Sequence, residues 1–376
     1  MDKKIPMRTK SSRTSFDKEN PPRRDSHQKK VKTCLMVGWT APQEGGSERH
    51  IYELASRIPN SKVFTQKGSL CEKKIEVNIS GGSFIGNVLF ALASLFYSLR
   101  LVLAFRKKYD LVHLHENLTY FLVPLLRLRY EVVVTMHGMK GFKYYDNKSY
   151  WLFFRQGLKF ANRLIAVNLS DKELLERYFD PSKIVYVPNG VDTSIYQGLK
   201  VKVERKIGFI GRVHEQKGII YLLEAFEKIS KEDKEVRLEI IGEVNDYAKK
   251  LQKKFPNKNI DWKGYQSNRD KIARMLSSSW CIALPSLWEG LPLTLFESLA
   301  SKRPLVVSKI PAFESVIKNE AIFCKVKDSD SLAKELLRVL SDYKLADSIG
   351  AKGNKLSKKY DWNSLARELE GVYENA

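Results

Sequence analysis

The sequence has only four cysteines among its 376 residues, and they form no recognisable site. They are far apart and include no Cys-x-x-Cys pair, so neither a zinc finger nor a disulfide framework is indicated. Near its start the chain has no apolar run of the length that a signal peptide needs. A reducing compartment fits these absences best, and we expect a cytoplasmic protein.

Negative charge is also scarce. The chain has 65 Lys and Arg for 43 Asp and Glu, a formal net charge of +22, while hydrophobic residues make up 43%, enough for large cores. Such an excess favours polyanionic partners: nucleic acid, acidic lipid or a phosphorylated substrate. Residues 1–32 contain eleven Lys and Arg against four Asp and Glu, and we expect them to form a disordered basic tail.

One apolar run is long enough to raise the question of a membrane. Phe84–Phe105 has 22 residues and a single charge, Arg100, and about 20 residues cross a bilayer. A crossing would separate the stretches before it from the strand-like Leu111–His115, and would leave the first domain without half its sheet. We therefore expect a helix that is buried in a domain or touches a membrane surface, with insertion as the alternative.

In the rest of the chain, short β-branched runs alternate with helical stretches, which is typical of parallel sheets with crossover helices. The first series of expected strands is Thr33–Trp39, Lys62–Thr65, Leu111–His115, Glu131–Thr135, Arg163–Val167 and Ile184–Val187. The second is Lys206–Gly211, Val236–Ile241, Ile260–Trp262, Trp280–Leu284 and Pro304–Ser308. The sequence thus predicts an α/β protein of two doubly wound Rossmann-like domains, residues 33–195 and 205–360, followed by a C-terminal helix over 361–376 that packs back on the first domain.

The loops after strands are the informative ones, because open parallel sheets bind ligands beyond the carboxyl ends of their strands. After the first strand, Gly45 and Gly46 precede a helix expected from Glu48, where the backbone can approach an anion; a simple turn is the alternative. In the second domain, Arg212 and Lys217 follow a strand and precede a helix. The Arg fork and the Lys charge together can neutralise a diphosphate, although a solvated basic loop is the alternative.

The loop after the fourth strand of the second domain carries the strongest signal. Glu289 lies in a Gly/Pro-rich turn, and Glu297 lies about one turn into the following helix. That helix is expected to begin near Pro292 or Leu293, with the N–H groups of Leu293 and Thr294 free to meet phosphate oxygens. The two carboxylates can bind hydroxyl groups, and the helix terminus beside them can bind an anion. This arrangement predicts a ligand that has both a sugar and a pyrophosphate.

These motifs resemble a known family. The chain contains, in order, GGSE, VPNGVD, GRVHEQKG and PSLWEGLPLTLFESLASKRPLVVS. This combination closely resembles the retaining, nucleotide-sugar-dependent glycosyltransferases of family 4, and the resemblance covers about Thr33 to Glu374. It implies the GT-B fold, in which two Rossmann-like domains face each other across a cleft. It also implies transfer of a sugar from a UDP- or GDP-sugar to an acceptor hydroxyl, with no metal or other cofactor.

The resemblance implies roles for single residues by motif position. It places the diphosphate at Arg212 and Lys217, the ribose at Glu297, and the transferred sugar at Glu289 and His137. The residues that it implies in donor binding are Gly45, Gly46, Arg212, Lys217, Gly264, Tyr265, Gly290, Leu293, Thr294 and Glu297. Of these, the turn at 264–265 is implied in the nucleobase pocket.

Other motifs depart from the family pattern or contain candidate metal ligands. Where the family commonly has Gly-x-Gly, this chain has Gly242-Glu243-Val244, which leaves the preference for a base open. His113 and His115 flank a strand end, but no third metal ligand stands near them in the sequence, so we interpret them as structural or cleft-lining. Asp328-Ser329-Asp330 resembles the acidic motif of metal-dependent glycosyltransferases, but it lies where a helix cap is expected.

The sequence leaves two alternatives and an open acceptor. An epimerase or phosphorylase of the same fold is one alternative; a nucleic-acid-binding protein is the other, but the chain has no aromatic-basic RNA motif, zinc knuckle or recognition helix. We therefore expect no nucleic acid partner. The apolar run, the basic cluster after it and the stretch Lys140–Tyr145 suit an anionic membrane surface. A peripheral enzyme on the cytoplasmic membrane face, acting on a glycan or lipid-linked acceptor, is the expectation.

Overall fold

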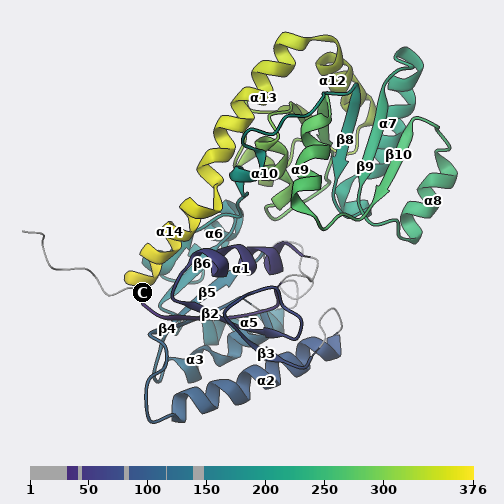
Figure 1. Cartoon of the computed structure of the whole chain (residues 1–376). Helices are drawn as coiled ribbons and strands as arrows, with labels where there is room; N and C mark the ends of the chain where they lie inside the picture. The colour runs from purple at the N-terminus through teal and green to yellow at the C-terminus, as the bar shows by residue number, and fades with distance from the viewer. Residues whose placement is uncertain (1–31, 41–44, 80–83, 116, 139–147) are drawn as a thin grey trace, which may run out of the picture. The chain divides into compact units, whose positions relative to one another are not determined.

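The computed structural model describes residues 32–40, 45–79, 84–115, 117–138 and 148–376 (Figure 1). Residues 32–376 form a single compact unit. Two stretches interpreted from the sequence fall outside the described residues: the basic tail up to Val31, and the segment Lys140–Tyr145.

The first domain is built on a parallel sheet whose described strands have the order β3-β2-β1-β4-β5-β6-β7. These strands are β1 (Cys34–Val37), β2 (Ser61–Gln66), β3 (Lys74–Val77), β4 (Leu111–Leu114), β5 (Glu131–Met136), β6 (Arg163–Ala166) and β7 (Ile184–Tyr186). The chain leaves β1 on one side through β2 and β3, and returns to β4 on the other. The carboxyl ends of β1 and β4 therefore lie where the strand order reverses, the place at which open parallel sheets bind ligands.

Helices cover both faces of this sheet, because alternate strand residues point to opposite sides. Leu35 and Val37 lie in one hydrophobic core, whereas Cys34 and Met36 lie in another. Figure 1 shows α1 on one face and α2 and α3 on the other. The helices are α1 (Gly46–Arg57), α2 (Phe84–Leu103), α3 (Val123–Leu126), α5 (Lys148–Leu158) and α6 (Leu169–Glu176), with 3-10 turns at Asn117–Leu122, Pro181–Lys183 and Thr193–Tyr196.

The second domain repeats this plan on a parallel sheet of order β10-β9-β8-β11-β12-β13. Its strands are β8 (Lys206–Ile210), β9 (Arg237–Ile241), β10 (Ile260–Gly264), β11 (Cys281–Leu284), β12 (Leu305–Ser308) and β13 (Ile322–Cys324). Its helices are α7 (Ile219–Glu232), α8 (Asp246–Lys254), α9 (Arg269–Ser278), α10 (Leu293–Ala300), α11 (Pro311–Glu314), α12 (Ser329–Ser341) and α13 (Tyr343–Ser357), with 3-10 turns at Glu215–Lys217 and Lys358–Tyr360. The predicted fold class, two doubly wound α/β domains, is confirmed.

The last helix, α14 (Trp362–Glu374), packs on the first domain although it follows the second in the sequence. Its residues Trp362, Leu365 and Leu369 share a core with Ile51 and Leu54 of α1. Because all five side chains are almost fully buried, α14 completes one face of the first sheet.

The structure differs from the sequence-based expectation where elements are short or capped. The edge strands β3 and β13, of four and three residues, are not among the expected strands. The stretch Ser329–Tyr360, which the sequence pattern predicts to be helical, is interrupted at Asp342. The Asp342 carboxylate accepts a hydrogen bond from the Leu345 N–H at 2.9 Å and so begins a new helix. Asp328 caps α12 through the Ser331 N–H at 2.8 Å, which confirms its predicted capping role.

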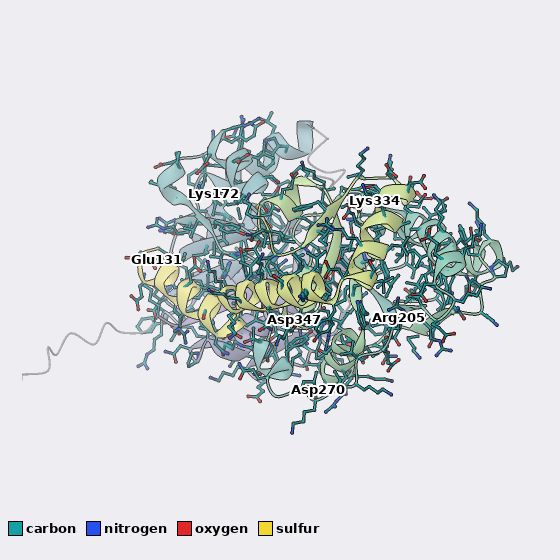
Figure 2. The ribbon with its side chains drawn as sticks, turned by 90° about the horizontal axis from the view of Figure 1, so that it is seen from above. Glu131, Lys172, Arg205, Asp270, Lys334 and Asp347 are labelled. Atoms are coloured by element: carbon teal, nitrogen blue, oxygen red, sulfur yellow. The ribbon has the colours of Figure 1, made fainter. Side chains whose placement is uncertain are left out.

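The many charged side chains lie mostly at the outside. Figure 2 shows the side chains surrounding the ribbon, and of those labelled there Arg205 and Lys334 are exposed. An exception is the pair Lys206 and Glu239, which joins neighbouring strands at 3.2 Å with both side chains buried. Distributing the positive charge over the surface spares the cores the cost of burying it.

Helix α2 packs with one face only. Phe90 and Leu101 are buried in the core of the first domain, whereas Phe96 and Leu103 are 70% and 80% exposed. Within the described part of the chain, α2 is the one helix long and apolar enough to cross a membrane, judged by length and composition. Its buried face makes it a part of the first domain, and its other face leaves a strip of apolar side chains uncovered.

Candidate functional site

Loops from both sheets line one cavity of about 610 Å³. Of the site residues predicted from the sequence, it is lined by Gly45, Gly46, His137, Arg212, Lys217, Tyr265, Glu289, Gly290, Leu293, Thr294 and Glu297. Gly264 is not among the lining residues, and its role in donor binding stays a prediction. Its φ of +69° makes the turn that brings Tyr265 to the cavity, and its carbonyl accepts a hydrogen bond from the Gly242 N–H at 3.1 Å.

Lys217 and Glu289 form an ion pair on the wall of this cavity. The Nζ of Lys217 lies 2.5 Å from Oε1 of Glu289, and the Ser286 hydroxyl donates to the same oxygen at 2.8 Å. Gly218 has a φ of +63° and lies so close to the Pro285 carbonyl that a Cβ there would collide with it. A glycine is therefore required for the loop after β8 to reach the loop after β11, and this approach brings the two charges together.

The N-terminus of α10 borders the same cavity. The helix begins at Leu293, as predicted, with Pro292 at the cap position, and among the described residues no side chain caps it. The first N–H groups of a helix have no partner within it, so Leu293 and Thr294 present partial positive charge to the cavity. The exposed guanidinium of Arg212 lines the cavity as well. This part of the wall is therefore suited to an anion.

Glu297 has a partner that the sequence did not indicate. The guanidinium of Arg269, at the start of α9, donates to Oε1 of Glu297 in a charge-assisted hydrogen bond. The Glu297 carboxylate raises the pKa of Arg269, and burial together with the same carboxylate raises the pKa of Tyr196 well above its usual value. Arg269 thus holds one oxygen of Glu297 and leaves the other for a ligand.

The first domain contributes the N-terminus of α1. The helix begins at Gly46, two residues earlier than expected, and Gly45 occupies the cap position without a capping side chain. The Ser47 hydroxyl donates to Glu48 Oε2 at 2.8 Å, which holds that carboxylate at the helix terminus. The two glycines thus lie at a second helix N-terminus on the cavity.

Comparison with known proteins decides the family. The model of Glycosyltransferase Family 4 matches residues 44–195, and that of Glycosyl transferases group 1 matches residues 192–356. A UDP-Gal:alpha-D-GlcNAc-diphosphoundecaprenol alpha-1,3-galactosyltransferase of Escherichia coli is 31% identical over 268 residues, which are 63% of this chain and 68% of that protein. The chain belongs to glycosyltransferase family 4.

Further relatives agree with this family. A phosphatidyl-myo-inositol mannosyltransferase of Mycobacterium leprae is 27% identical over 71% of this chain and 73% of its own length. The crystal structure of Anabaena HepE in complex with UDP superimposes with a TM-score of 0.75 at 13% identity, covering 92% of this chain and all of that chain. This family 4 chain is a glycosyltransferase, an enzyme that moves a sugar from a nucleotide sugar to an acceptor; the predicted family, fold and enzyme class are confirmed.

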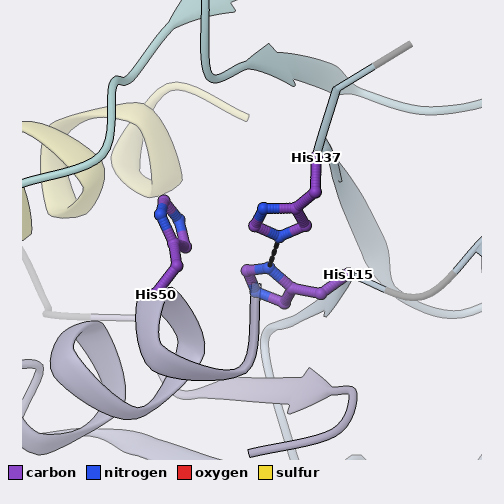
Figure 3. A group of neighbouring side chains, drawn as sticks. All are labelled: His50, His115 and His137. Atoms are coloured by element: carbon purple, nitrogen blue, oxygen red, sulfur yellow. Dashed lines mark hydrogen bonds between the residues drawn. The ribbon is translucent and has the colours of Figure 1, made fainter. Parts of the chain in front are cut away.

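The family 4 site includes a histidine cluster that sequence reasoning missed (Figure 3). His50 of α1, His115 after β4 and His137 after β5 each offer one ring nitrogen, and these atoms lie within 4.8 Å of one another. The Nδ1 of His115 lies 3.1 Å from Nε2 of His137. The sequence showed no third ligand beside His115, because residues 50 and 137 become its neighbours only through the folded sheet.

His113 has a structural position, as predicted. Its ring nitrogens bond to the Tyr373 hydroxyl and the Thr135 hydroxyl, both at 2.7 Å. Burial, with repulsion from the other rings, lowers the pKa of His113, His115 and His137 well below the usual range. Burial also lowers the pKa of His50 to about 4. At neutral pH the four imidazoles are therefore uncharged.

Asn189, in the motif VPNGVD, connects the cluster to the loop between β11 and α10. Its side-chain NH₂ donates to the Leu291 carbonyl at 2.6 Å, and its Oδ1 lies 2.9 Å from Nδ1 of His50. Because the NH₂ faces Leu291, the oxygen must accept from His50, which then carries its proton on Nδ1. Nothing in the sequence pattern singled out Asn189, since a single Asn before Gly is more often a turn residue.

Proposed function

We propose that this enzyme takes its sugar from a UDP-sugar and transfers it, with retention at the anomeric carbon, to a hydroxyl of a lipid-linked glycan. The observation that carries the proposal is the buried pair of Lys217 and Glu289 beside the uncapped N-terminus of α10. One ligand with a diphosphate and a sugar would engage the cation, the helix terminus and the carboxylate at once. The UDP in the HepE structure and the UDP-Gal in the name of the Escherichia coli relative support the choice of base.

Positive groups at the diphosphate supply the main rate acceleration in this proposal. As the glycosidic bond breaks, negative charge develops on the leaving diphosphate, and Arg212, Lys217 and the α10 terminus are already oriented towards it. Each such preorganised donor stabilises a transition state by about 2.7–4 kcal/mol. Because these groups are permanently present in the chain, transfer needs no catalytic metal. We expect full activity in EDTA.

Carboxylates and the histidine position the sugar and the nucleoside. Glu289, held by Lys217 and Ser286, has its second oxygen available for sugar hydroxyls. His137 reaches the cavity from the first domain, where it can contact the same sugar. Glu297, oriented by Arg269, accepts from the ribose hydroxyls. Retention follows if the acceptor attacks the face that the diphosphate leaves, with a diphosphate oxygen taking the acceptor proton.

A screen of nucleotide sugars tests this function directly. The purified chain is incubated with UDP- and GDP-sugars and a short lipid-diphosphate glycan, and NMR of the product reports the anomeric configuration. The expected result is release of UDP that depends on acceptor and gives the same anomer as the donor. Interconversion of donor sugars without acceptor would indicate an epimerase, and release that requires inorganic phosphate a phosphorylase. An inverted product would contradict the proposed retention but would still support sugar transfer.

The exposed face of α2 supports an acceptor at a membrane. Ile85, Leu92, Phe96 and Leu103 recur at helical spacing on the uncovered side of the helix, and Phe105 just beyond it is 98% exposed. The strip continues into exposed Arg106, Lys107 and Lys108, and no Asp or Glu occurs between residues 84 and 109. Apolar side chains beside cations are what adsorption to an anionic bilayer requires. We propose that α2 lies on the cytoplasmic membrane face, where lipid-linked acceptors are presented.

Vesicle flotation tests this surface separately from the reaction. The full chain is expected to float with vesicles that contain anionic lipid and to lose most of that binding in the double variant F96S/L103S. Tyr343→Ser, which removes an exposed aromatic from the second domain, is the matched control and should float normally. Absence of flotation at physiological salt, or flotation unaffected by F96S/L103S, would contradict docking through α2 and leave the donor chemistry untouched.

A further inference from the structure

The histidine cluster has the composition of a transition-metal site. Three imidazoles from three elements converge, and their nearest nitrogens lie within 4.8 Å (Figure 3). Three-histidine sets bind zinc with one position open, and imidazole suits Zn²⁺ and its neighbours better than Mg²⁺ or Ca²⁺. The group includes no carboxylate, which excludes a site of the hard-cation type.

The spacing of His115 and His137 is close to that of two ligands on one ion. Their facing nitrogens, Nδ1 and Nε2, lie 3.1 Å apart. Two nitrogens at the usual zinc distance of about 2.0–2.1 Å and tetrahedral angles would be separated by roughly 3.3–3.4 Å. A single proton now occupies the space between these two nitrogens. Replacing it by an ion requires only that this proton move to the other nitrogen of its own ring, so both rings stay neutral.

Where His115 is the donor of this hydrogen bond, the far nitrogen of His115 receives the proton. Its Nε2 is buried and has no hydrogen-bond partner among the described residues. A buried polar atom without a partner is uncommon, and it often marks a site whose ligand or water is missing. The ion would bind Nδ1 rather than Nε2, so the N–H formed at Nε2 needs a water molecule as its acceptor.

His50 is oriented as a metal ligand by Asn189. The Asn189 oxygen accepts from Nδ1 of His50 at 2.9 Å, so the lone pair of His50 lies on Nε2. Histidines that bind metals usually donate their other N–H to such an oxygen, which fixes both ring and tautomer. The second contact of Asn189, to the Leu291 carbonyl at 2.6 Å, prevents the amide from reversing.

We propose that His50, His115 and His137 bind one Zn²⁺ ion, through His50 Nε2, His115 Nδ1 and His137 Nε2, with the fourth position open to the cavity that His137 lines. The ion enters through the cavity, because His50 and His115 are almost fully buried.

Zinc and donor then exclude each other. His137 cannot use Nε2 for the ion and for a donor sugar at the same time, so zinc inhibits transfer. This consequence rests on the proposed function, whereas the site itself does not. Binding is therefore measured without substrate.

Zinc titration of the full chain against a chromophoric chelator tests the site, with Co²⁺ absorption as an independent report on nitrogen ligation. One ion per chain is expected. His50→Gln and His115→Gln should each abolish stoichiometric binding, and Asn189→Ala should weaken it by about 10- to 100-fold. His214→Gln, which removes an exposed histidine of the second domain, should leave it unchanged.

Circular dichroism and thermal unfolding of each variant establish that it is folded. If H50Q or H115Q does not fold, the site is tested by zinc binding of the milder N189A variant and by the Co²⁺ spectrum of the unaltered chain. No binding by the unaltered chain at about 100 μM free zinc, or one ion retained in both H50Q and H115Q, would overturn the site. One ion that UDP-sugar does not displace would support the site and contradict only the inhibition.

Discussion

The Nζ of Lys217 lies 2.5 Å from Oε1 of Glu289, with both side chains largely buried. The two residues come from loops that follow different strands, and the Leu287 N–H, which donates to the Gln216 carbonyl at 2.7 Å, fastens one loop to the other. Breaking one partner of such a pair leaves the other charge buried and uncompensated. The pair is therefore a structural contact between the two loops as well as part of the proposed diphosphate site.

Lys217→Ala is expected to lower kcat by about a hundred- to a thousandfold, because one preorganised cation at the leaving diphosphate is lost. Glu289→Gln should lower it similarly, since the amide keeps its size but not its charge. Initial rates with saturating donor measure both. Lys228→Ala, which breaks the exposed ion pair between Lys228 of α7 and Asp330 of α12, is the matched control. If K217A kept more than about a tenth of the activity, the diphosphate role would be wrong.

Arg269→Ala should weaken UDP binding by about tenfold, the equivalent of about 1.4 kcal/mol, because Glu297 loses the partner that orients it. At saturating donor the rate should change less, since the ribose lies away from the reacting carbon. Calorimetry with UDP measures the Kd. Arg274→Ala removes an exposed arginine from the same helix and should leave the Kd unchanged. Equal affinities of the two variants would show that Arg269 does not position Glu297 for the nucleotide.

The stability of the enzyme should fall as the pH drops below 6.5. Burial lowers the pKa of His50 to about 4, so below pH 6.5 the unfolded chain binds a proton that the folded chain excludes. The stabilisation from the uncharged His50 is fully present well above pH 6.5 and is lost as the pH falls towards 4. His50 alone lowers the free energy of unfolding by about 2 kcal/mol at pH 5. Urea unfolding in EDTA at pH 7 and pH 5 measures it. His50→Gln should show a smaller decrease, and an identical slope would contradict the assignment.

Tyr373→Phe should destabilise the fold by about 1–3 kcal/mol, because it leaves Nδ1 of His113 buried without its partner at 2.7 Å. The lost hydrogen bond joins α14 to strand β4, so the substitution should weaken the packing of α14 on the first sheet. Urea unfolding at neutral pH measures it. Tyr343→Phe alters an exposed tyrosine and serves as the control. A loss no larger than that of the control would mean that the contact between Tyr373 and His113 adds no net stability.

Much of the fold is predictable from short-range pattern. The alternation of β-branched runs with helical stretches predicted two parallel α/β domains, and the central strands β1, β4, β5, β8 and β11 lie within or near their expected bounds. The pattern does not predict the edge strand β3, in which two of four residues are the charged Lys74 and Glu76. It also does not predict the break at Asp342, because a helix cap depends on one hydrogen bond.

Much of the cavity wall was also predictable, for a geometric reason. Gly45, Lys217 and Glu289 each follow a strand of a parallel sheet, and such strands direct all their following loops to one edge. Gly264 shows the limit of this argument. It lies in the expected turn, but Tyr265, its neighbour, is the residue of this pair that lines the cavity.

The sequence by itself determined the two doubly wound domains, the family and the loops that carry charge, because each depends on residues close together in the chain. Only the tertiary structure decided which distant residues meet. His50 joins His137, Asn189 reaches Leu291, and Arg269 pairs with Glu297 through the packing of whole sheets and helices. It also decided that one face of α2 is covered and the other is not, since the apolar composition of that helix is nearly the same on both sides.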